Sequence, residues 1–284
     1  MVTVKFIRDD GAEFTIDNVT WKIPSDGLIG FDSVDVDYET ERKAFGDGSF
    51  EKGISVNEKD RTVTAILTNR NLNKVMREIV QRFFGVKRKF KVIVDYDGDS
   101  KYCEGRIIAF ALPTNNIYDL LELKVTILST QPYLLSIDEF GQNIAGIEPR
   151  FGMPYASLVG LGFVFGLFKF AKEVPLINDG DVETYMKVVI NAKGTVQNPE
   201  ILKDDYFIKI NDTLQANDVI VIDLVKEPPE ITKNGKSIMG KLDRNSDLEN
   251  LKLNVGTNKI QYDAFGGSDN MEVVIYYNKR YGGM

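Results

Sequence analysis

The sequence predicts a mainly β protein in which at least one domain is a sandwich of two sheets. Residues 175–201 carry the clearest evidence, because Met186, Val188 and Ile190 alternate with less apolar neighbours at the two-residue period of a strand. Turn residues precede this strand at Asn178-Asp179-Gly180 and follow it at Ala192-Lys193-Gly194, and Pro199 is expected to close the unit. Short strands with turn residues between them recur along the chain, and only one long helical pattern interrupts them.

The first half contains several such strands. Val2, Val4 and Phe6 alternate, and the only tryptophan lies in a short run at 20–23. The acidic run 32–41 is expected to form the solvent-exposed face of a strand. Further strands are expected at 61–67, 89–95, 102–112 and 120–129, and in the second half at 206–210, 219–224 and 272–277, with a type I′ hairpin turn at Asn234-Gly235.

One segment has the periodicity of an amphipathic helix. Its apolar residues fall three or four positions apart and form one stripe, which should pack on a sheet. Asn69 or Asn71 is available as the N-cap, and Gly85 is expected at the C′ position beyond the helix end. The stripe consists of Leu72, Val75, Met76, Ile79, Val80 and Phe83.

With 284 residues the chain is long enough for two domains with cores of their own. We expect a first domain at 1–134, an irregular crossover at 135–160, where Pro and Gly are frequent and no period is sustained, and a second domain at 161–284. The apolar tract 158–170 is too short to span a bilayer and is predicted to be a buried strand entering the second domain. The first residues lack the apolar segment of a secretory signal.

Composition excludes whole classes of active site. The chain has no histidine and only one cysteine, so it cannot assemble a Ser-His-Asp triad, a Cys-His pair, a zinc site of the HExxH type or an intrachain disulfide. Cys103 is predicted to be a buried strand residue. We therefore expect no enzymatic activity and predict no catalytic residue, no cofactor and no metal ligand.

The net charge of −7 argues against nucleic acid as a partner. The basic run 87–91 is expected to be a solvated helix end instead. Asp95, Asp97 and Asp99 imitate the start of a calcium-binding EF-hand loop, but Ser100 and Arg106 stand where that loop needs Gly and Glu. A hairpin turned at Asp97-Gly98 explains the same residues.

A glycine-rich loop at 44–53 contains two phenylalanines. Loops rarely expose such residues to water, so Phe45 and Phe50 either fold back on their own core or dock on a neighbouring molecule. The sequence alone does not decide between these two alternatives.

Two other functions stay open at this point. A carbohydrate-binding module is possible, with Tyr206, Tyr262, Tyr276 and Tyr277 as stacking platforms. A glycosidase with two acidic residues is also possible, because it needs no histidine.

Four features together resemble the distal tail (Dit) proteins of siphophages that infect Gram-positive bacteria. They are the strand and Gln-Pro-Tyr turn at 123–134, the segment 175–201, the hairpin, loop and closing strand at 234–260, and the order of strands, one helix, strands, crossover and second sandwich. The resemblance covers most of the chain, although it consists of turn and strand patterns and not of a catalytic signature.

The resemblance implies a virion structural protein, encoded by a phage or prophage. The N-terminal domain would be a β-sandwich-like domain with one helix and an extended hairpin, and would close a homohexameric ring. The C-terminal domain would be a galectin-like β-sandwich; galactoside binding is not expected there, because the galectin site requires histidine. The ring would be the hub between the tail tube protein and the tail-associated tip or fibre protein, with a receptor-binding protein as a further partner. It would lie at the tail tip of the virion after assembly in the host cytoplasm. No membrane partner is implied. The family's ring-closing hairpin would correspond to the 44–53 loop, which gives the candidate oligomer interface Phe45, Gly46, Gly48, Phe50 and Gly53.

Overall fold

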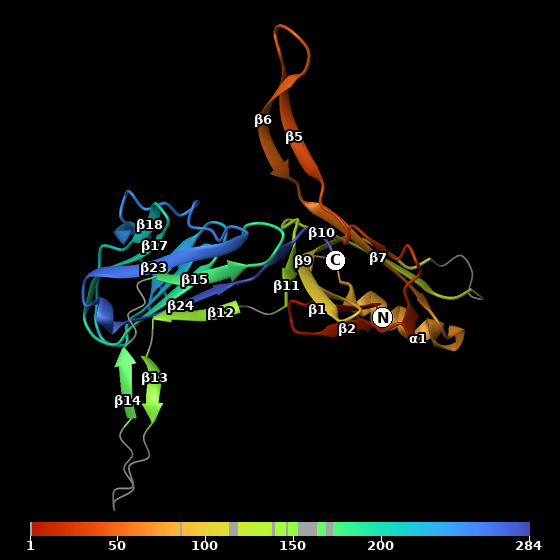
Figure 1. Cartoon of the computed structure of the whole chain (residues 1–284). Coiled ribbons are helices and arrows are strands. Elements are labelled where there is room, and N and C mark those ends of the chain that lie inside the picture. Colours follow the sequence, from red (N-terminus) through yellow and green to blue (C-terminus); the bar gives the residue numbers. More distant parts are fainter. Residues whose placement is uncertain are drawn as a thin grey trace, which may run out of the picture. The chain divides into compact units, whose positions relative to one another are not determined.

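The computed structural model describes residues 2–85, 87–113, 119–137, 140–145, 147–152, 164–168 and 173–284. The chain divides into two compact units, which are described separately (Figure 1). The N-terminal unit comprises Met1–Ile137 and Arg280–Met284, and the C-terminal unit comprises Asp138–Lys279. Strands dominate both units, so the predicted mainly β fold class is confirmed.

One ten-stranded sheet builds most of the N-terminal unit, and its strand pairs are antiparallel. The buried side chains of each strand alternate with exposed ones, as the two-residue period predicts. The main path of the sheet is β2 (Glu13–Ile16), β1 (Val2–Arg8), β8 (Lys89–Tyr96), β9 (Asp99–Ala111), β10 (Glu122–Ser129), β7 (Lys59–Leu67) and β3 (Trp21–Lys22), with β4 (Leu28–Ile29) on β7 and with β11 (Leu134–Ser136) joining β9 to β25 (Arg280–Tyr281).

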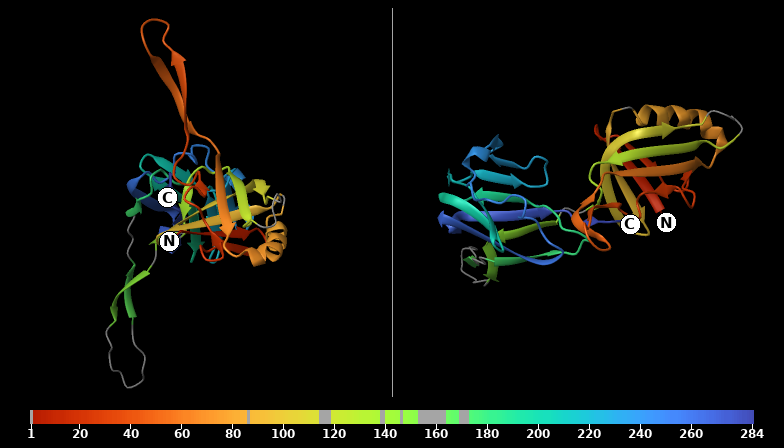
Figure 2. Two further views of the ribbon diagram at one scale, coloured as in Figure 1. Left: turned by 90° about the vertical axis from the view of Figure 1, so that its right-hand side faces the viewer. Right: turned by 90° about the horizontal axis from the view of Figure 1, so that it is seen from above.

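The predicted helix forms as α1 (Asn73–Phe83), after a 3₁₀ turn at Arg70–Leu72. It covers the inner face of the sheet, where Val80 and Phe83 are buried in the core (Figure 2). The sheet covers only part of the apolar stripe of the helix, since Val75 and Ile79 are 54% and 44% exposed. Asn69 caps the 3₁₀ turn and accepts a hydrogen bond from the backbone of Asn71.

Gly85 occupies the predicted C′ position, after the C-cap residue Phe84, but the helix does not end in the usual glycine conformation. Gly85 follows the helix but does not adopt the left-handed conformation of a C′ glycine. The basic run 87–91 does not serve the helix end either, because β8 begins at Lys89. Instead, Arg8 of β1 donates hydrogen bonds from Nη1 to the carbonyls of Arg82 and Phe83, at 3.2 and 3.1 Å. A residue distant in sequence thus satisfies the free carbonyls at this end.

The C-terminal unit is a sandwich of a six-stranded and a five-stranded sheet whose facing side chains fill one core. The six-stranded sheet contains β12 (Phe140–Ala145), β24 (Met271–Tyr277), β16 (Lys187–Ala192), β20 (Val219–Asp223), β21 (Glu230–Lys233) and β22 (Lys236–Ser237). The five-stranded sheet contains β15 (Glu173–Asn178), β23 (Gly256–Gly266), β17 (Val196–Lys203), β18 (Tyr206–Lys209) and β19 (Thr213–Leu214). Two 3₁₀ turns lie at Met239–Lys241 and Ser268–Asn270.

The segment 175–201 turns where the sequence indicates. Asn178 is fully buried, and its side chain donates to the carbonyls of Val182 and Leu253 and accepts from the backbone of Gly180. Met186, Val188 and Ile190 are buried as predicted. Pro199 does not close the unit, because it lies inside β17 opposite Ala264, where its carbonyl accepts a hydrogen bond from Ile210. A proline can occupy a strand where its missing N–H is not needed for pairing.

The stretch 135–160, expected to be irregular, contains the end of β11 and the whole of β12 and β13 (Ile147–Gly152). Strand β13 pairs with β14 (Val164–Phe168) in a separate two-stranded sheet. The apolar tract 158–170 lies outside the described residues except for the residues of β14. The described residues include no helix of the length and hydropathy that crossing a membrane requires.

Candidate functional site

The strands β5 (Val36–Arg42) and β6 (Ser49–Val56) form a hairpin that extends away from the sheet of its own unit (Figure 1). Within the described part of the chain these two strands pair only with each other. At the strand rise of about 3.4 Å per residue, the hairpin is about 25 Å long. A two-stranded hairpin of this kind is marginally stable in water unless another surface covers it.

The sequence places different chemistry on the two faces of the hairpin. Val36 lies opposite Val56 and Tyr38 lies opposite Ile54, so these four side chains share one face, the apolar face. Tyr38 and Ile54 are each 58% exposed. The exposure leaves an apolar patch that no described element of the unit covers.

The opposite face of the hairpin is acidic. Asp37 and Glu39 lie on this face with Glu41, and Phe50 lies on it opposite Glu41. All four residues are exposed. Glu41 forms an ion pair with Lys52, the extra residue at a β-bulge, at 2.8 Å. We call the surface formed by Asp37, Glu39, Glu41 and Phe50 the acidic face.

The five candidate interface residues fall on this hairpin. Phe45, Gly46 and Gly48 form the turn, and Phe50 and Gly53 belong to β6. Gly46 and Gly48 have positive φ angles of 87° and 93°, a conformation that glycine adopts without strain. Phe45 is 95% exposed and Phe50 is 61% exposed, so neither ring folds back on the core of its own unit. Docking on a neighbour is the alternative that remains, and the interface itself stays a prediction.

The root of the hairpin is fixed to the sheet. Lys59, at the start of β7, is buried and its Nζ lies 2.7 Å from the Asp35 carboxylate. Three more carboxylates surround this root, those of Asp32, Glu58 and Asp60. They line an acidic groove of about 610 Å³ together with Ile29, Ile108 and Leu128. The hairpin thus leaves the unit from an acidic part of the outer sheet face.

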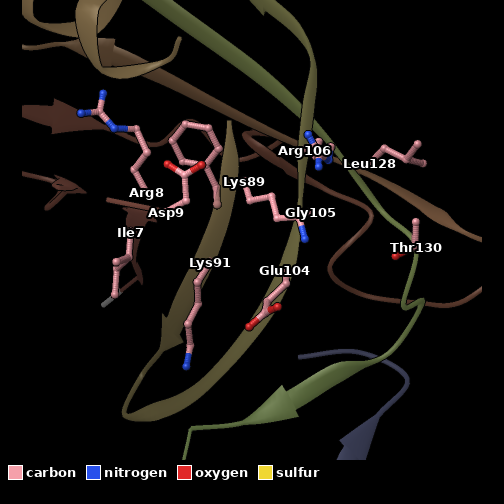
Figure 3. Close-up of a pocket in the computed structure, with 11 residues that line it drawn as sticks. Ile7, Arg8, Asp9, Lys89, Lys91, Glu104, Gly105, Arg106, Leu128 and Thr130 are labelled. Carbon is pink, nitrogen blue, oxygen red and sulfur yellow. The ribbon is translucent and has the colours of Figure 1, made fainter. Parts of the chain in front are cut away.

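A second groove on the outer face of the same sheet is basic. It has a volume of about 350 Å³ and is lined by four cationic residues, two acidic residues and apolar side chains that include Ile7 and Leu128 (Figure 3). The Arg8 guanidinium turns to the helix end on the inner face, so the cationic side chains of the outer face are those of Lys89, Lys91 and Arg106. Leu128 is shared with the acidic groove. The charged lining residues of this basic groove are Arg8, Lys89, Lys91, Arg106, Asp9 and Glu104.

Strand register explains why these charges gather. Lys89 and Lys91 alternate along β8 with the buried Phe90 and Val92, so both lysines face away from the core. Lys89 lies directly opposite Arg106 on β9. Like charges opposite one another destabilise a strand pair, which is a cost that an anionic partner would remove.

The cations of the basic groove differ in how strongly they are held. The Arg8 guanidinium pairs with Asp10 at 2.6 Å, and this hydrogen bond holds the pKa of the Asp10 carboxyl far below its usual range. Arg106 donates to the carbonyl of Lys87 at 3.0 Å, and the Lys91 ammonium lies 3.7 Å from the centre of the Tyr102 ring. The side chain of Lys89 is exposed and forms no ion pair or hydrogen bond with the described residues.

The sequence interpretation missed most of these residues. Ile54 and Val56 have the two-residue period of a strand, as do Val36 and Tyr38 within the acidic run 32–41, and this shared period is the signal that could have paired them. Lys89 and Lys91 were noticed but interpreted as part of a helix end. No local pattern indicates Arg106, because only the sheet register brings it next to Lys89. Arg8 lies opposite Phe90 in the same way, and its side chain turns to the helix end.

The proposed sugar platforms do not form one surface. Tyr262 and Tyr277 are both buried, and burial raises the pKa of each phenol. Tyr277 also donates a hydrogen bond to the carbonyl of Ile177 at 2.8 Å. Tyr206 belongs to the five-stranded sheet and Tyr276 to the six-stranded sheet, so these two tyrosines occupy opposite layers of the sandwich.

The aspartates that imitate an EF-hand form a hairpin, as predicted. Asp97 and Gly98 have φ angles of 55° and 95°, which fits a type I′ turn between β8 and β9. Asp95 accepts hydrogen bonds from the backbone of Gly98 and from the Ser100 hydroxyl. Among the described residues, no group of three potential ligands could hold a metal ion.

Residues 179–281 match a known protein family, described as siphovirus-type tail component, C-terminal domain. The matched segment spans somewhat more than a third of the chain and lies in the C-terminal unit except for its last two residues, so this part of the chain is similar to a component of siphophage tails. Curated protein sequences contain no match to this chain.

The fold of the whole chain is similar to that of the Dit protein of phage SPP1, whose crystal structure is described as a paradigm of the hub adsorption apparatus in phages infecting Gram-positive bacteria. The TM-score is 0.69 at 11% sequence identity, over 98% of both chains. A chain from the phage P2 baseplate in its activated conformation with calcium gives a TM-score of 0.55 at 9% identity over 100% of both chains. The baseplate with strontium gives 0.54 at 9% identity, with the same coverage. The resemblance to distal tail proteins is confirmed by the family match and by this shared fold.

Proposed function

We propose that the protein is the hub of a siphophage tail, a homohexameric ring that its N-terminal units close and that joins the tail tube to the tip proteins. The observation that carries the ring is the β5–β6 hairpin, which exposes Phe45, Phe50 and the apolar face. An exposed patch of this kind on an otherwise well-packed unit indicates a protein–protein interface.

The proposed mechanism is geometric. The hairpin of each copy lies against the next copy, so donor and receiving surfaces differ and the contact repeats from copy to copy. A rotation that returns to the first copy closes the ring, and the side chains of Phe45 and Phe50 are then buried. The tail tube protein would bind one face of the ring. The tip or fibre protein, and with it a receptor-binding protein, would bind the other.

The function that we propose for the protein is therefore that of a scaffold and not of an enzyme. Where the pKa of a described carboxyl group shifts clearly, it shifts downward, as for Asp95, Asp212 and Asp218. A glycosidase needs one carboxyl group with a raised pKa as its general acid. The lowered pKa values thus support structural roles for these carboxyl groups, in turns and ion pairs. The site of action would be the virion tail tip, after assembly in the host cytoplasm.

Size-exclusion chromatography with multi-angle light scattering tests the ring. The full chain is expected to have the mass of six copies, and Phe45→Ser with Phe50→Ser is expected to shift it to a monomer. Phe265→Ser is the matched control, since Phe265 is 81% exposed on β23 of the other unit, and this variant should keep the mass of wild type. A wild-type chain that stays monomeric at high concentration would contradict the proposal, and an intact oligomer in the double variant would exclude these phenylalanines from the interface.

A further inference from the structure

We infer that the basic groove is the surface that receives the hairpin of the next copy, with the acidic face of β5 lying against Lys89 and Lys91. This inference rests on the proposed ring. It names the surface that receives the hairpin and the charges that favour this contact. The partner is a second copy of this chain.

The donor surface carries carboxylates without internal partners. The carboxylates of Asp37 and Glu39 are exposed and form no ion pair or hydrogen bond with the described residues. They lie two residues apart on β5 and therefore point to the same side of the hairpin. An acidic stripe of this kind binds most favourably where cations occur at a similar spacing.

The receiving surface has that spacing. Lys89 and Lys91 are also two residues apart on one face of a strand, β8, so their Cα atoms repeat at the same interval of about 7 Å. Lys89 has no internal partner, and its neighbour across the strand pair is the cationic Arg106. The apolar side chains of Ile7 and Leu128 in the groove offer contact area beside these charges.

The arrangement of charge favours head-to-tail contacts. The acidic groove at the hairpin root and the basic groove lie on the same outer sheet face and meet at Leu128. The acidic face of a hairpin is therefore repelled by the acidic groove, because both carry negative charge. The same face is attracted to the basic groove of another copy. Every copy carries one donor and one receiver, so the contact repeats in one direction around a ring.

Charge reversal on each surface tests the inference. Lys89→Glu with Lys91→Glu reverses the groove, and Asp37→Lys with Glu39→Lys reverses the hairpin. Each variant alone is expected to associate at least 10-fold more weakly than wild type. An equimolar mixture should restore association, because in an alternating ring every hairpin then meets a groove of opposite charge. Lys22→Glu with Lys124→Glu is the matched control, since both lysines are exposed on strands of the same sheet outside the groove.

Light scattering of the separate and mixed variants at low ionic strength gives the result. Rescue in the mixture, with an undisturbed control, supports the inference. Oligomers that survive both reversals, two variants that stay monomeric when mixed, or a control that also dissociates would overturn it. Survival of both reversals together with loss of the oligomer in the Phe45 and Phe50 variant would reject the groove but keep the ring, whereas a monomeric wild type would reject the ring itself.

Discussion

The N-terminal unit contains two long hairpins of similar local geometry and opposite environment. In β8–β9, the alternating residues Phe90, Val92 and Val94 are buried against the helix and the sheet core. In β5–β6, the alternating residues Val36 and Tyr38 remain exposed. Alternation determines which side chains share a face, but a covering surface decides whether that face is buried. For β5–β6, the proposed cover is another copy of the chain.

The residues of one hairpin should stabilise the folded single chain, whereas those of the other should stabilise the contact between copies. Residues of β8–β9 contribute to the core, so their removal should cost free energy of unfolding in a single chain. Residues of β5–β6 contact little beyond their own hairpin, so their removal should affect association and leave the monomer intact. Matched substitutions on the two hairpins can test this division.

The largest expected effect is that of Phe90→Ala. Phe90 is fully buried, and its ring lies 5.8 and 5.9 Å from the rings of Phe83 and Phe84. Removing it should lower the free energy of unfolding by about 3–5 kcal/mol. Urea denaturation followed by circular dichroism measures the change. Phe50→Ala, measured on monomers, should change it by less than about 0.5 kcal/mol. Similar losses in the two variants would refute the division.

The next largest effect is expected from alanine substitutions at two glycines, one in each hairpin. A Cβ atom at Gly105 of β9 would lie 2.4 Å from the carbonyl oxygen of Leu128, whereas a Cβ at Gly53 of β6 would meet nothing closer than Glu39, at 4.0 Å. Gly105→Ala should therefore destabilise the fold by about 1–3 kcal/mol through the forced shift of β10. Gly53→Ala should be neutral or slightly stabilising, because glycine weakens a strand. Differential scanning calorimetry distinguishes the two variants, and equal melting temperatures would contradict the expected close approach.

Local signals in the sequence predicted the elements well. The type I′ turns at Asp97-Gly98 and Asn234-Gly235 form as expected, with positive φ at all four residues, because these pairs tolerate that conformation. The helix and the buried alternation in β8 and β16 follow from periodicity. Such features depend on residues close together in the sequence, so they can be predicted from one sequence alone.

Long-range features could not be predicted in the same way. The exposure of Val75 and Ile79 and the burial of Tyr262 and Tyr277 depend on which elements pack against them. Arg8 replaces the expected glycine at the helix end only because the sheet brings β1 beside it. The basic groove likewise arises from the register of β1, β8 and β9, which no local pattern fixes.

A hairpin of the C-terminal unit provides an intermediate case, because its turn is tied to neighbouring loops. The Asp218 carboxylate accepts a hydrogen bond from the backbone of Gln215 and from the side chain of Asn234 in the β21–β22 turn, and pairs with Lys233 at 3.0 Å. These contacts lower the pKa of Asp218 from 3.8 to about 2.

Since the folded state holds this proton more weakly than the unfolded state, the contribution of Asp218 to stability is complete above about pH 4 and is lost as the pH falls towards 2. Asp218→Asn should therefore lower the melting temperature at pH 7, and the difference from wild type should shrink between pH 4 and pH 2. Thermal unfolding across this range checks the prediction, and a difference independent of pH would assign the effect to lost shape and not to charge.

The smallest effect is expected within the exposed hairpin, from the ion pair of Lys52 and Glu41. Their side chains are 56% and 62% exposed, so water and salt screen the attraction, and the pair should contribute no more than about 0.5 kcal/mol. Lys52→Ala should therefore leave the free energy of unfolding of the monomer unchanged and increase amide hydrogen exchange in β5 and β6 by at most about threefold. Glu41→Ala and the double variant complete the cycle. A much larger increase would mean that the pair holds the hairpin together without its neighbour, so that the hairpin would be a preformed arm and not one that assembly stabilises.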